Sequence, residues 1–110
     1  MSSFDPAVVQ QIPTAAAEST DVGLVVVQHL NHIGLPEVAR DHESRIVFGE
    51  KKYGQRLKIN NGRDALLDSY QELLDSLSYL MQAHLEGKTG SLWLFERSAE
   101  LCKEVKRMLA

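Results

Sequence analysis

The chain has 110 residues and a formal net charge of −3, which predicts one domain with a modest core that self-association would help to stabilise. The acidic balance argues against direct nucleic-acid binding, because non-specific binders show a basic stripe. The single cysteine excludes a disulfide framework within the chain and fits a reducing compartment. No apolar run approaches the ~20 residues that span a bilayer, and the first residues lack the basic segment of a secretory signal. We therefore expect a cytoplasmic protein that does not insert into membranes.

A flexible N-terminal tail is predicted at residues 1–19, ahead of a single helical domain at residues 20–110. Two prolines and the small-residue run TAAAEST interrupt the tail, and no helical period is sustained. The pattern also allows a short helix at residues 7–12. The apolar residues that give the tail a grip for a protein partner are Phe4, Val8, Val9 and Ile12.

The first predicted helix lies within STDVGLVVVQHLNHIG. Ser19, Thr20 or Asp21 can cap it, and Gly34 is a natural stop. Apolar residues recur at helical spacing, namely Val22, Val26, Leu30 and Ile33. The three valines at 25–27 would also suit a buried strand, but the chain offers no second strand of comparable quality to pair with.

The second predicted helix lies within LPEVARDHESRIVFGEKKYG. Pro36 and Glu37 suit its first turn, while two lysines in the last turn and a following Gly54 mark its end. Its apolar stripe consists of Val38, His42, Ile46, Gly49 and Tyr53. Glycine costs about 1 kcal/mol relative to alanine inside a helix, so Gly49 marks either a close approach of another backbone or a break.

The third predicted helix runs from Gly62 to Leu85, with Asn61 as its cap. It carries the best-patterned apolar face of the chain, formed by Leu66, Leu67, Tyr70, Leu73, Leu74, Leu77, Leu80 and Met81. Four acids share the opposite face, namely Asp64, Asp68, Glu72 and Asp75.

This acidic face has two interpretations. Most charged helix faces are simply solvated, but these usually mix signs, and no Lys or Arg occurs between Arg63 and Lys88. Each like-charge pair costs roughly 0.2–0.5 kcal/mol, and the repulsion is expected to have no local relief. Aspartate is also a poorer helix former than glutamate. The pattern therefore suits a hard divalent cation such as Mg²⁺, which prefers carboxylate oxygens.

The fourth predicted helix lies within SLWLFERSAELCKEVKRMLA, with Thr89 or Ser91 as its cap. Leu94, Leu101, Val105 and Met108 form its apolar stripe. Trp93 and Phe95 point to different sides, so either one of them is available to a partner or both are core. Four helices joined by short loops predict an all-α, four-helix bundle-like domain.

Two smaller groups of residues also suggest binding sites. Arg56, Lys58 and Arg63 precede or begin the third helix, where a helix N-terminus and arginine forks could hold phosphates, although a loop with ordinary surface charges is the commoner outcome. The histidines at 29 and 32 have a spacing that allows metal binding, but half-exposed helix residues are the commoner outcome. Cys102 is expected to be a buried small hydrophobe.

The segment YQELLDSLSYL resembles the E-x-x-D helix of the all-α nucleoside triphosphate pyrophosphohydrolases, the MazG-like and dimeric dUTPase-like group. Glu72 and Asp75 occupy the two motif positions. The longer pattern KKYGQRL…NNGRDALLDSYQELLDSLSYLMQ is similar to small phage and prophage proteins of MazG-like type. The resemblance covers about residues 40–85.

The resemblance implies a helical bundle, dimeric or tetrameric, that hydrolyses a nucleoside triphosphate to release pyrophosphate. Glu72 and Asp75 would hold Mg²⁺ between two helices, with Asp68 as an auxiliary ligand. The family's second acidic pair, E-x-x-E, is absent from the preceding helix, and we expect Glu43 and Glu50 to take its catalytic place. Without them the site would bind metal weakly or not at all, as in a binding descendant of an enzyme fold. The alternative hypothesis is a non-enzymatic phage-type regulator or inhibitor, which engages a host protein through its acidic face or apolar tail.

Overall fold

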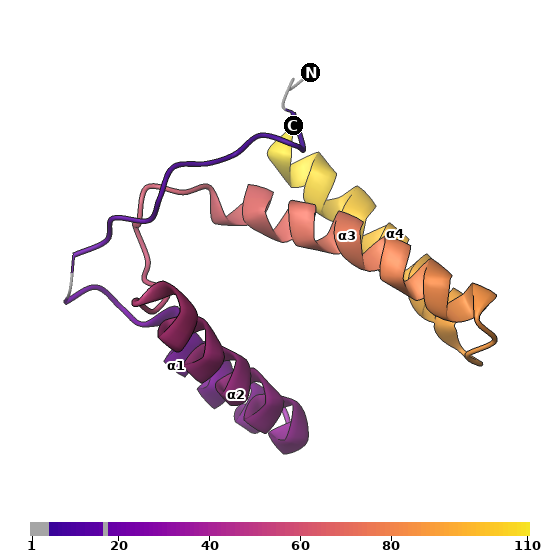
Figure 1. Cartoon of the computed structure of the whole chain (residues 1–110), viewed down its shortest axis with the longest axis horizontal. Helices are drawn as coiled ribbons and strands as arrows, with labels where there is room; N and C mark the ends of the chain where they lie inside the picture. Colours follow the sequence, from indigo (N-terminus) through magenta and orange to yellow (C-terminus); the bar gives the residue numbers. More distant parts are fainter. Residues whose placement is uncertain (1–4, 17) are drawn as a thin grey trace. The chain divides into compact units, whose positions relative to one another are not determined.

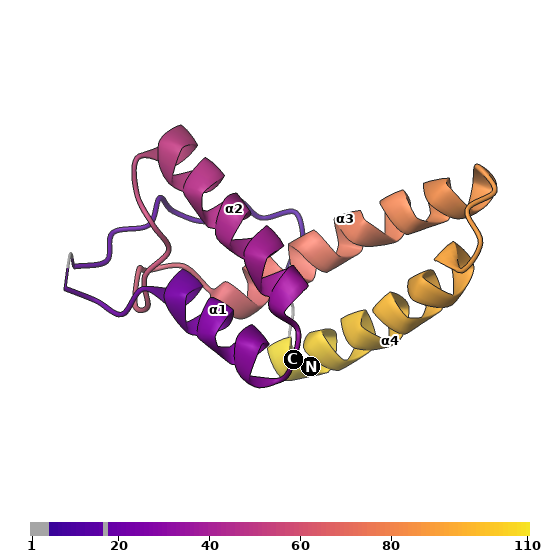
Figure 2. The same ribbon diagram turned by 90° about the horizontal axis from the view of Figure 1, so that it is seen from below.

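The computed structural model describes residues 5–16 and 18–110, and these residues form an all-α protein, as predicted. Four helices follow one another, α1 (Val22–His32), α2 (Pro36–Tyr53), α3 (Ala65–Leu85) and α4 (Ser91–Leu109). Helix α1 packs on α2, and α3 packs on α4, so that each pair is a helical hairpin (Figures 1 and 2).

The chain divides into two compact units. The α1–α2 unit is Ile12–Gly62, and the α3–α4 unit is Arg63–Ala110 together with residues 5–11. Each unit therefore consists of one hairpin and an extended segment from the predicted tail. Among the described residues, no helix combines the length and the apolar character that crossing a membrane requires.

Local signals place α1 and α2 where the sequence predicts them. The Asp21 carboxylate caps α1 by accepting a hydrogen bond from the Leu24 amide at 3.3 Å. Helix α2 begins at Pro36, and Gly54 ends it with a φ of 75°, the left-handed conformation that glycine adopts without strain. The three valines are helical. Helix α2 continues through Gly49 without a break, and a Cβ built there has no neighbour within 4 Å. The expectation of a break or a close approach at Gly49 is therefore wrong.

The close approach between α1 and α2 occurs at Gly23 instead. A Cβ at this position would lie 2.6 Å from Ile46 Cδ1, so the absent side chain makes room for α2. Ala39, with 2% of its surface exposed, is the buried centre of α2. Val38 and Tyr53 of the predicted stripe are 50% and 69% exposed, whereas Ala39, the small residue beside Val38, is buried.

A short ladder of backbone hydrogen bonds closes the base of the α1–α2 unit. The loop after α2 pairs antiparallel with the residues before α1, through Val22 N–H to Leu57 O at 3.0 Å and Ile59 N–H to Thr20 O at 3.2 Å. Thr14 N–H also donates to Asn61 O at 3.0 Å. These bonds satisfy backbone groups that the helices leave free.

The predicted caps of α3 and α4 are wrong. The Asp64 carboxylate, and not Asn61, caps α3 by accepting from the Leu66 and Leu67 amides at 3.0 and 3.1 Å. Helix α3 therefore begins at Ala65, three residues later than predicted. Neither Thr89 nor Ser91 caps α4, because Gly90 occupies the cap position with a φ of 90° and no side-chain hydrogen bond is made.

The core of the α3–α4 unit lies between its two helices. Tyr70, Cys102 and Val105 are its buried centre, and the partly buried apolar residues packed against them are Leu66, Leu73, Leu74, Leu77 and Leu109. Burial raises the pKa of the Cys102 thiol, as expected for a buried small hydrophobe. Trp93 is 58% exposed beneath the Arg97 guanidinium, whereas Phe95 is partly buried, so the aromatic pair does face two environments.

Candidate functional site

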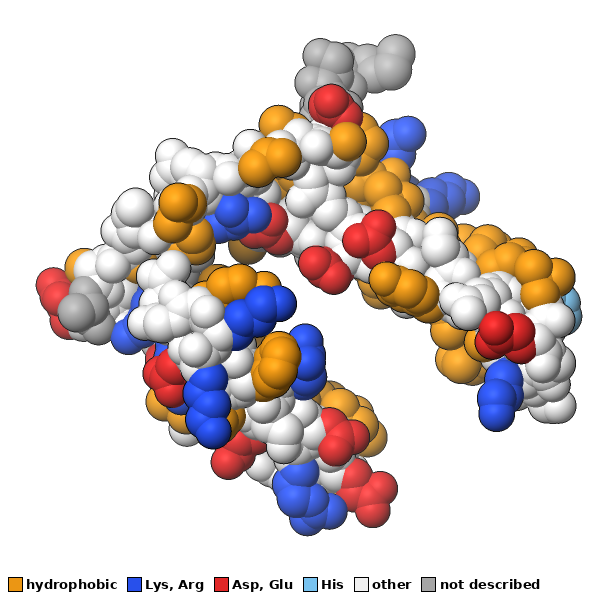
Figure 3. Space-filling model, viewed as in Figure 1, with side chains coloured by type: hydrophobic (Ala, Val, Ile, Leu, Met, Phe, Trp, Pro, Cys, Tyr) orange, Lys and Arg blue, Asp and Glu red, His pale blue; other side chains and the backbone are white. Residues whose placement is uncertain are grey.

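Acidic side chains lie along α3 (Figure 3), but they differ in what they contact. Asp64 is the helix cap, and its carboxylate is committed to two backbone amides. Asp64 therefore stabilises the N-terminus of the helix, and its carboxylate is not part of an acidic surface that is open to a ligand.

Asp68 is paired with a base. Its Oδ1 lies 2.7 Å from Arg63 Nη2, and its Oδ2 accepts from Arg63 Nε at 3.0 Å. This two-pronged contact raises the pKa of the Arg63 guanidinium, chiefly through the hydrogen bond. The expectation that the acidic face has no local relief is therefore wrong, because the chain before the helix bends so that Arg63 reaches Asp68.

The segment at residues 5–11, which we call the strap, lies against α3 and is not helical, so a helix at 7–12 is also wrong. Gln10 Nε2 donates to Asp64 O at 3.0 Å and to Asp68 Oδ1 at 2.9 Å. Gln71 Nε2 donates to the carbonyl oxygens of Pro6 and Val8, each at 2.8 Å. A segment this short cannot offset the cost of nucleating a helix, and its carbonyl groups bond to α3 instead.

Glu72 and Asp75 remain exposed. They lie on successive turns of α3, and neither has an ion pair or hydrogen bond with any residue that the structure describes. The two positions of the E-x-x-D motif are therefore the acids of this face that are still able to take a ligand.

Two carboxylates are a partial donor set for a metal. No group of three or more His, Cys, Asp or Glu side chains within residues 5–16 and 18–110 is arranged to hold an ion. Mg²⁺ usually keeps several waters and binds through one or two carboxylates plus substrate phosphates. Exposed Glu72 and Asp75 fit that limited requirement, with the remaining ligands supplied by water and substrate.

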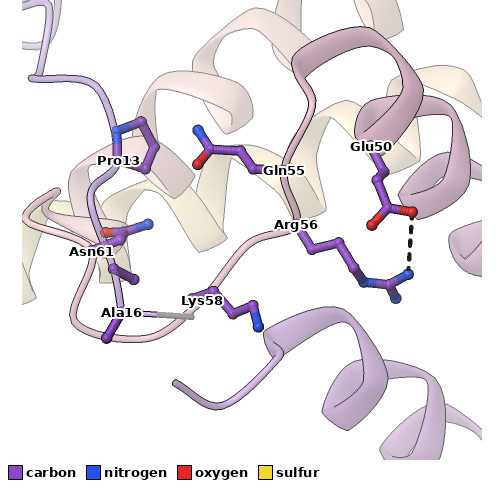
Figure 4. A pocket seen from close by; sticks show the side chains of 8 residues that line it. Pro13, Ala16, Glu50, Gln55, Arg56, Lys58 and Asn61 are labelled. Carbon is purple, nitrogen blue, oxygen red and sulfur yellow. Dashed lines mark ion pairs between the residues drawn. The ribbon is translucent and has the colours of Figure 1, made fainter. Parts of the chain in front are cut away.

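The predicted second acidic pair lies on α2, within the α1–α2 unit. Glu43 is exposed. Glu50 lies 3.8 Å from Arg56 Nη1, and both side chains line a cavity of about 340 Å³ (Figure 4). Glu50 thus faces a base, which lowers its capacity to serve as a metal ligand while that contact lasts.

The predicted phosphate-binding residues divide between two environments. Arg56 and Lys58 line the same cavity in the α1–α2 unit. Arg56 Nε also lies 2.6 Å from Asp21 Oδ2, an ion pair without the alignment of a hydrogen bond, and Lys58 Nζ donates to Ser19 O at 3.4 Å. Arg63 belongs to the α3–α4 unit and is bound to Asp68.

The histidines at 29 and 32 are exposed, with ring centroids 6.3 Å apart. Sequence reasoning missed Gln10 and Gln71, which organise the strap. Their contacts join residues more than fifty positions apart, and glutamine has no spacing rule that would have singled them out.

Comparison of the chain with models of known families, with curated proteins and with solved structures found no match. The likeness to the MazG-like group therefore remains a resemblance of motif residues.

Proposed function

We propose that the chain is a MazG-like, Mg²⁺-dependent nucleotide pyrophosphohydrolase or a degenerate relative of one. One observation carries the proposal. Of the four acids at the cap of α3 and along it, Asp64 and Asp68 are engaged within the protein, whereas the motif acids Glu72 and Asp75 are exposed and without a partner among the described residues.

Glu72 and Asp75 would hold the ion through their carboxylate oxygens, and Asp68 would assist if Arg63 released it. A bound Mg²⁺ neutralises phosphate charge and makes water easier to deprotonate. The carboxylates of Glu43 and Glu50 are the proposed general bases, which accept the proton of the attacking water.

Arg56, Lys58 and Arg63 are the proposed phosphate-binding residues. Arginine binds phosphate with a planar fork of donors, and Lys58 would add a compact positive charge. Each arginine already contacts a carboxylate, so phosphate binding would exchange one anion for another. The proposal therefore predicts a substrate of high negative charge, a nucleoside triphosphate.

Self-association into a dimer or tetramer is part of the proposal. Its support is the exposure of apolar side chains on α1, where Leu24 and Val25 are 54% and 50% exposed. Helices that are apolar on more than one face are usually covered. Sedimentation of the full chain measures the assembly, and a monomer at all concentrations would contradict it.

The test of the enzyme is incubation with a panel of nucleoside triphosphates and Mg²⁺, with detection of pyrophosphate. Glu72→Gln should abolish turnover without lowering the melting temperature. Glu96→Gln is the matched control, because Glu96 is an exposed acid on α4, and it should retain turnover. Absence of turnover with every nucleotide, together with no rise in melting temperature on adding Mg²⁺, would refute the proposal.

A second function, a non-enzymatic regulator that binds a host protein, has its own observation. Val9 and Ile12 of the tail are 91% and 77% exposed, so apolar side chains in the extended segment are available for contact. This function predicts that Val9→Ser with Ile12→Ser weakens capture of a protein partner, whereas Glu72→Gln does not. The opposite pattern would favour binding through the acidic face.

A further inference from the structure

We infer that the strap, residues 5–11, is a releasable cover over the first turns of α3, and that Arg63 is the latch that holds it. The inference goes beyond the proposed function, since it does not depend on which ligand Glu72 and Asp75 bind.

Four hydrogen bonds hold the strap by its backbone carbonyl groups. Gln71 donates to the carbonyls of Pro6 and Val8, and Arg63 Nη1 donates to those of Gln11 at 2.7 Å and Gln10 at 3.3 Å. Two side chains thus hold four strap carbonyl groups.

The Gln10 side chain of the strap forms hydrogen bonds with the cap residue Asp64 and with Asp68 of α3. Its amide nitrogen donates to Asp64 O, while its amide oxygen accepts from Asp64 N–H. The side chain therefore pairs with the cap residue as a neighbouring peptide group would, and it also donates to Asp68. Substitution of Gln10 alone should loosen this end of the strap.

The strap lacks the apolar packing that would make it permanent. Val9 is 91% exposed and Val8 is 43% exposed, so neither is a buried anchor. Hydrogen bonds to water replace such polar contacts at low net cost. The strap is therefore held by bonds that can open without uncovering a core.

Arg63 is the latch because one guanidinium makes both kinds of contact. Nε and Nη2 bind the two oxygens of Asp68, and this fixes the plane of the group. Nη1 is then directed at the strap carbonyls. Loss of the Asp68 charge would free the guanidinium and, with it, the strap.

The latch couples the strap to the acidic face. Asp68 precedes Glu72 by one turn of α3, and with the strap closed it is bound by Arg63 and Gln10. Any group that binds the Asp68 carboxylate in place of Arg63 must weaken the attachment of the strap to α3. By reciprocity, release of the strap must raise the affinity of Asp68 for that group. The strap thus regulates how much of the acidic face is open.

Backbone amide relaxation of the full chain, measured by NMR, tests the inference. In the unmodified protein, residues 7–11 should show order parameters near ~0.85, and in Arg63→Gln they should fall below about 0.6. Arg97→Gln is the matched control, because it removes the same charge from α4, where Arg97 covers Trp93, and it should leave the strap ordered. Raising the salt concentration from about 0.05 M to about 0.5 M should lower the order parameters of the strap only slightly, because salt screens a half-buried ion pair such as Arg63–Asp68 less than an exposed one.

Gln10→Ala guards against the case in which Arg63→Gln fails to fold, because residue 10 lies outside the helices. Its strap should also become mobile while the amide signals of α3 and α4 stay in place. Order parameters that are already low in the unmodified protein, that remain high in a folded Arg63→Gln, or that remain high at the Gln10 end of the strap in Gln10→Ala, would overturn the inference. Equal release in Arg97→Gln would overturn the role of Arg63.

Discussion

Each of the two units packs two antiparallel helices together, but the side chains at the helix contact differ in size between the units. The α3–α4 unit uses large side chains, with Tyr70 and Val105 buried and leucines around them. The α1–α2 unit uses small ones, with Gly23 and Ala39 as its buried helical residues, and adds a backbone ladder at its base. Large side chains bury area, whereas small ones bring helices close and leave the apolar residues beside them exposed.

The largest effect that tests this difference between the units is expected from removing a large side chain from the α3–α4 core. Tyr70→Ala should destabilise the protein by about 3–5 kcal/mol, as other buried aromatic truncations do. Amide hydrogen exchange should rise throughout α3 and α4 and stay unchanged in α1. Equal acceleration in all four helices would show that the units unfold together.

The corresponding change in the α1–α2 unit adds atoms. Gly23→Val should cost about 1–3 kcal/mol, because its Cβ alone would lie 2.6 Å from Ile46 Cδ1. Adding Ile46→Val removes that methyl group and should restore part of the loss in chemical denaturation. No recovery in the double variant would mean that the two side chains do not share the contact.

Caps provide a smaller contrast within the α3–α4 unit. Asp64→Ala should cost about 1 kcal/mol, because two helix amides lose their acceptor. Thr89→Ala should leave the free energy of unfolding within about 0.5 kcal/mol of its original value, since α4 has no side-chain cap. A large decrease in the free energy of unfolding of Thr89→Ala would indicate that Thr89 caps α4 after all.

The smallest expected effect is a loss of folding stability at alkaline pH. Burial raises the pKa of the Cys102 thiol, so above about pH 8.5 the unfolded chain releases its proton first and the folded state loses stability. This contribution is fully present below that pH. Cys102→Ala should abolish this part of the alkaline decline, measured as melting temperature against pH, and an unchanged decline would assign it to other groups.

Local signals in the sequence predicted most of the fold. Pro36, Gly54 and Asp21 act on their own neighbours, and the helices begin or end beside them. The cap of α3 was missed because Asn61 and Asp64 are both competent caps, and in the structure it is Asp64 that accepts from the Leu66 and Leu67 amides. The α1–α2 contact was missed because an apolar stripe marks large residues, whereas the contact is made by Gly23 and Ala39.

The candidate site was predictable only in part. Periodicity placed Glu72 and Asp75 on the solvent face of α3, and they are exposed there. Periodicity could not reveal that Arg63 and Gln10 form hydrogen bonds with Asp68, because those bonds depend on how the chain outside the helices bends. Whether the site binds Mg²⁺ and a nucleotide stays a prediction.

The backbone grip on the strap has an evolutionary consequence. Since α3 holds the carbonyls of Pro6 and Val8, which every amino acid possesses, the side chains at positions 7–9 are not needed for docking. Mutations can accumulate there while the strap keeps its path, whereas Gln10 is constrained by its side-chain bonds. The strap is thus a site where a new recognition sequence can arise without disturbing the helices beneath it.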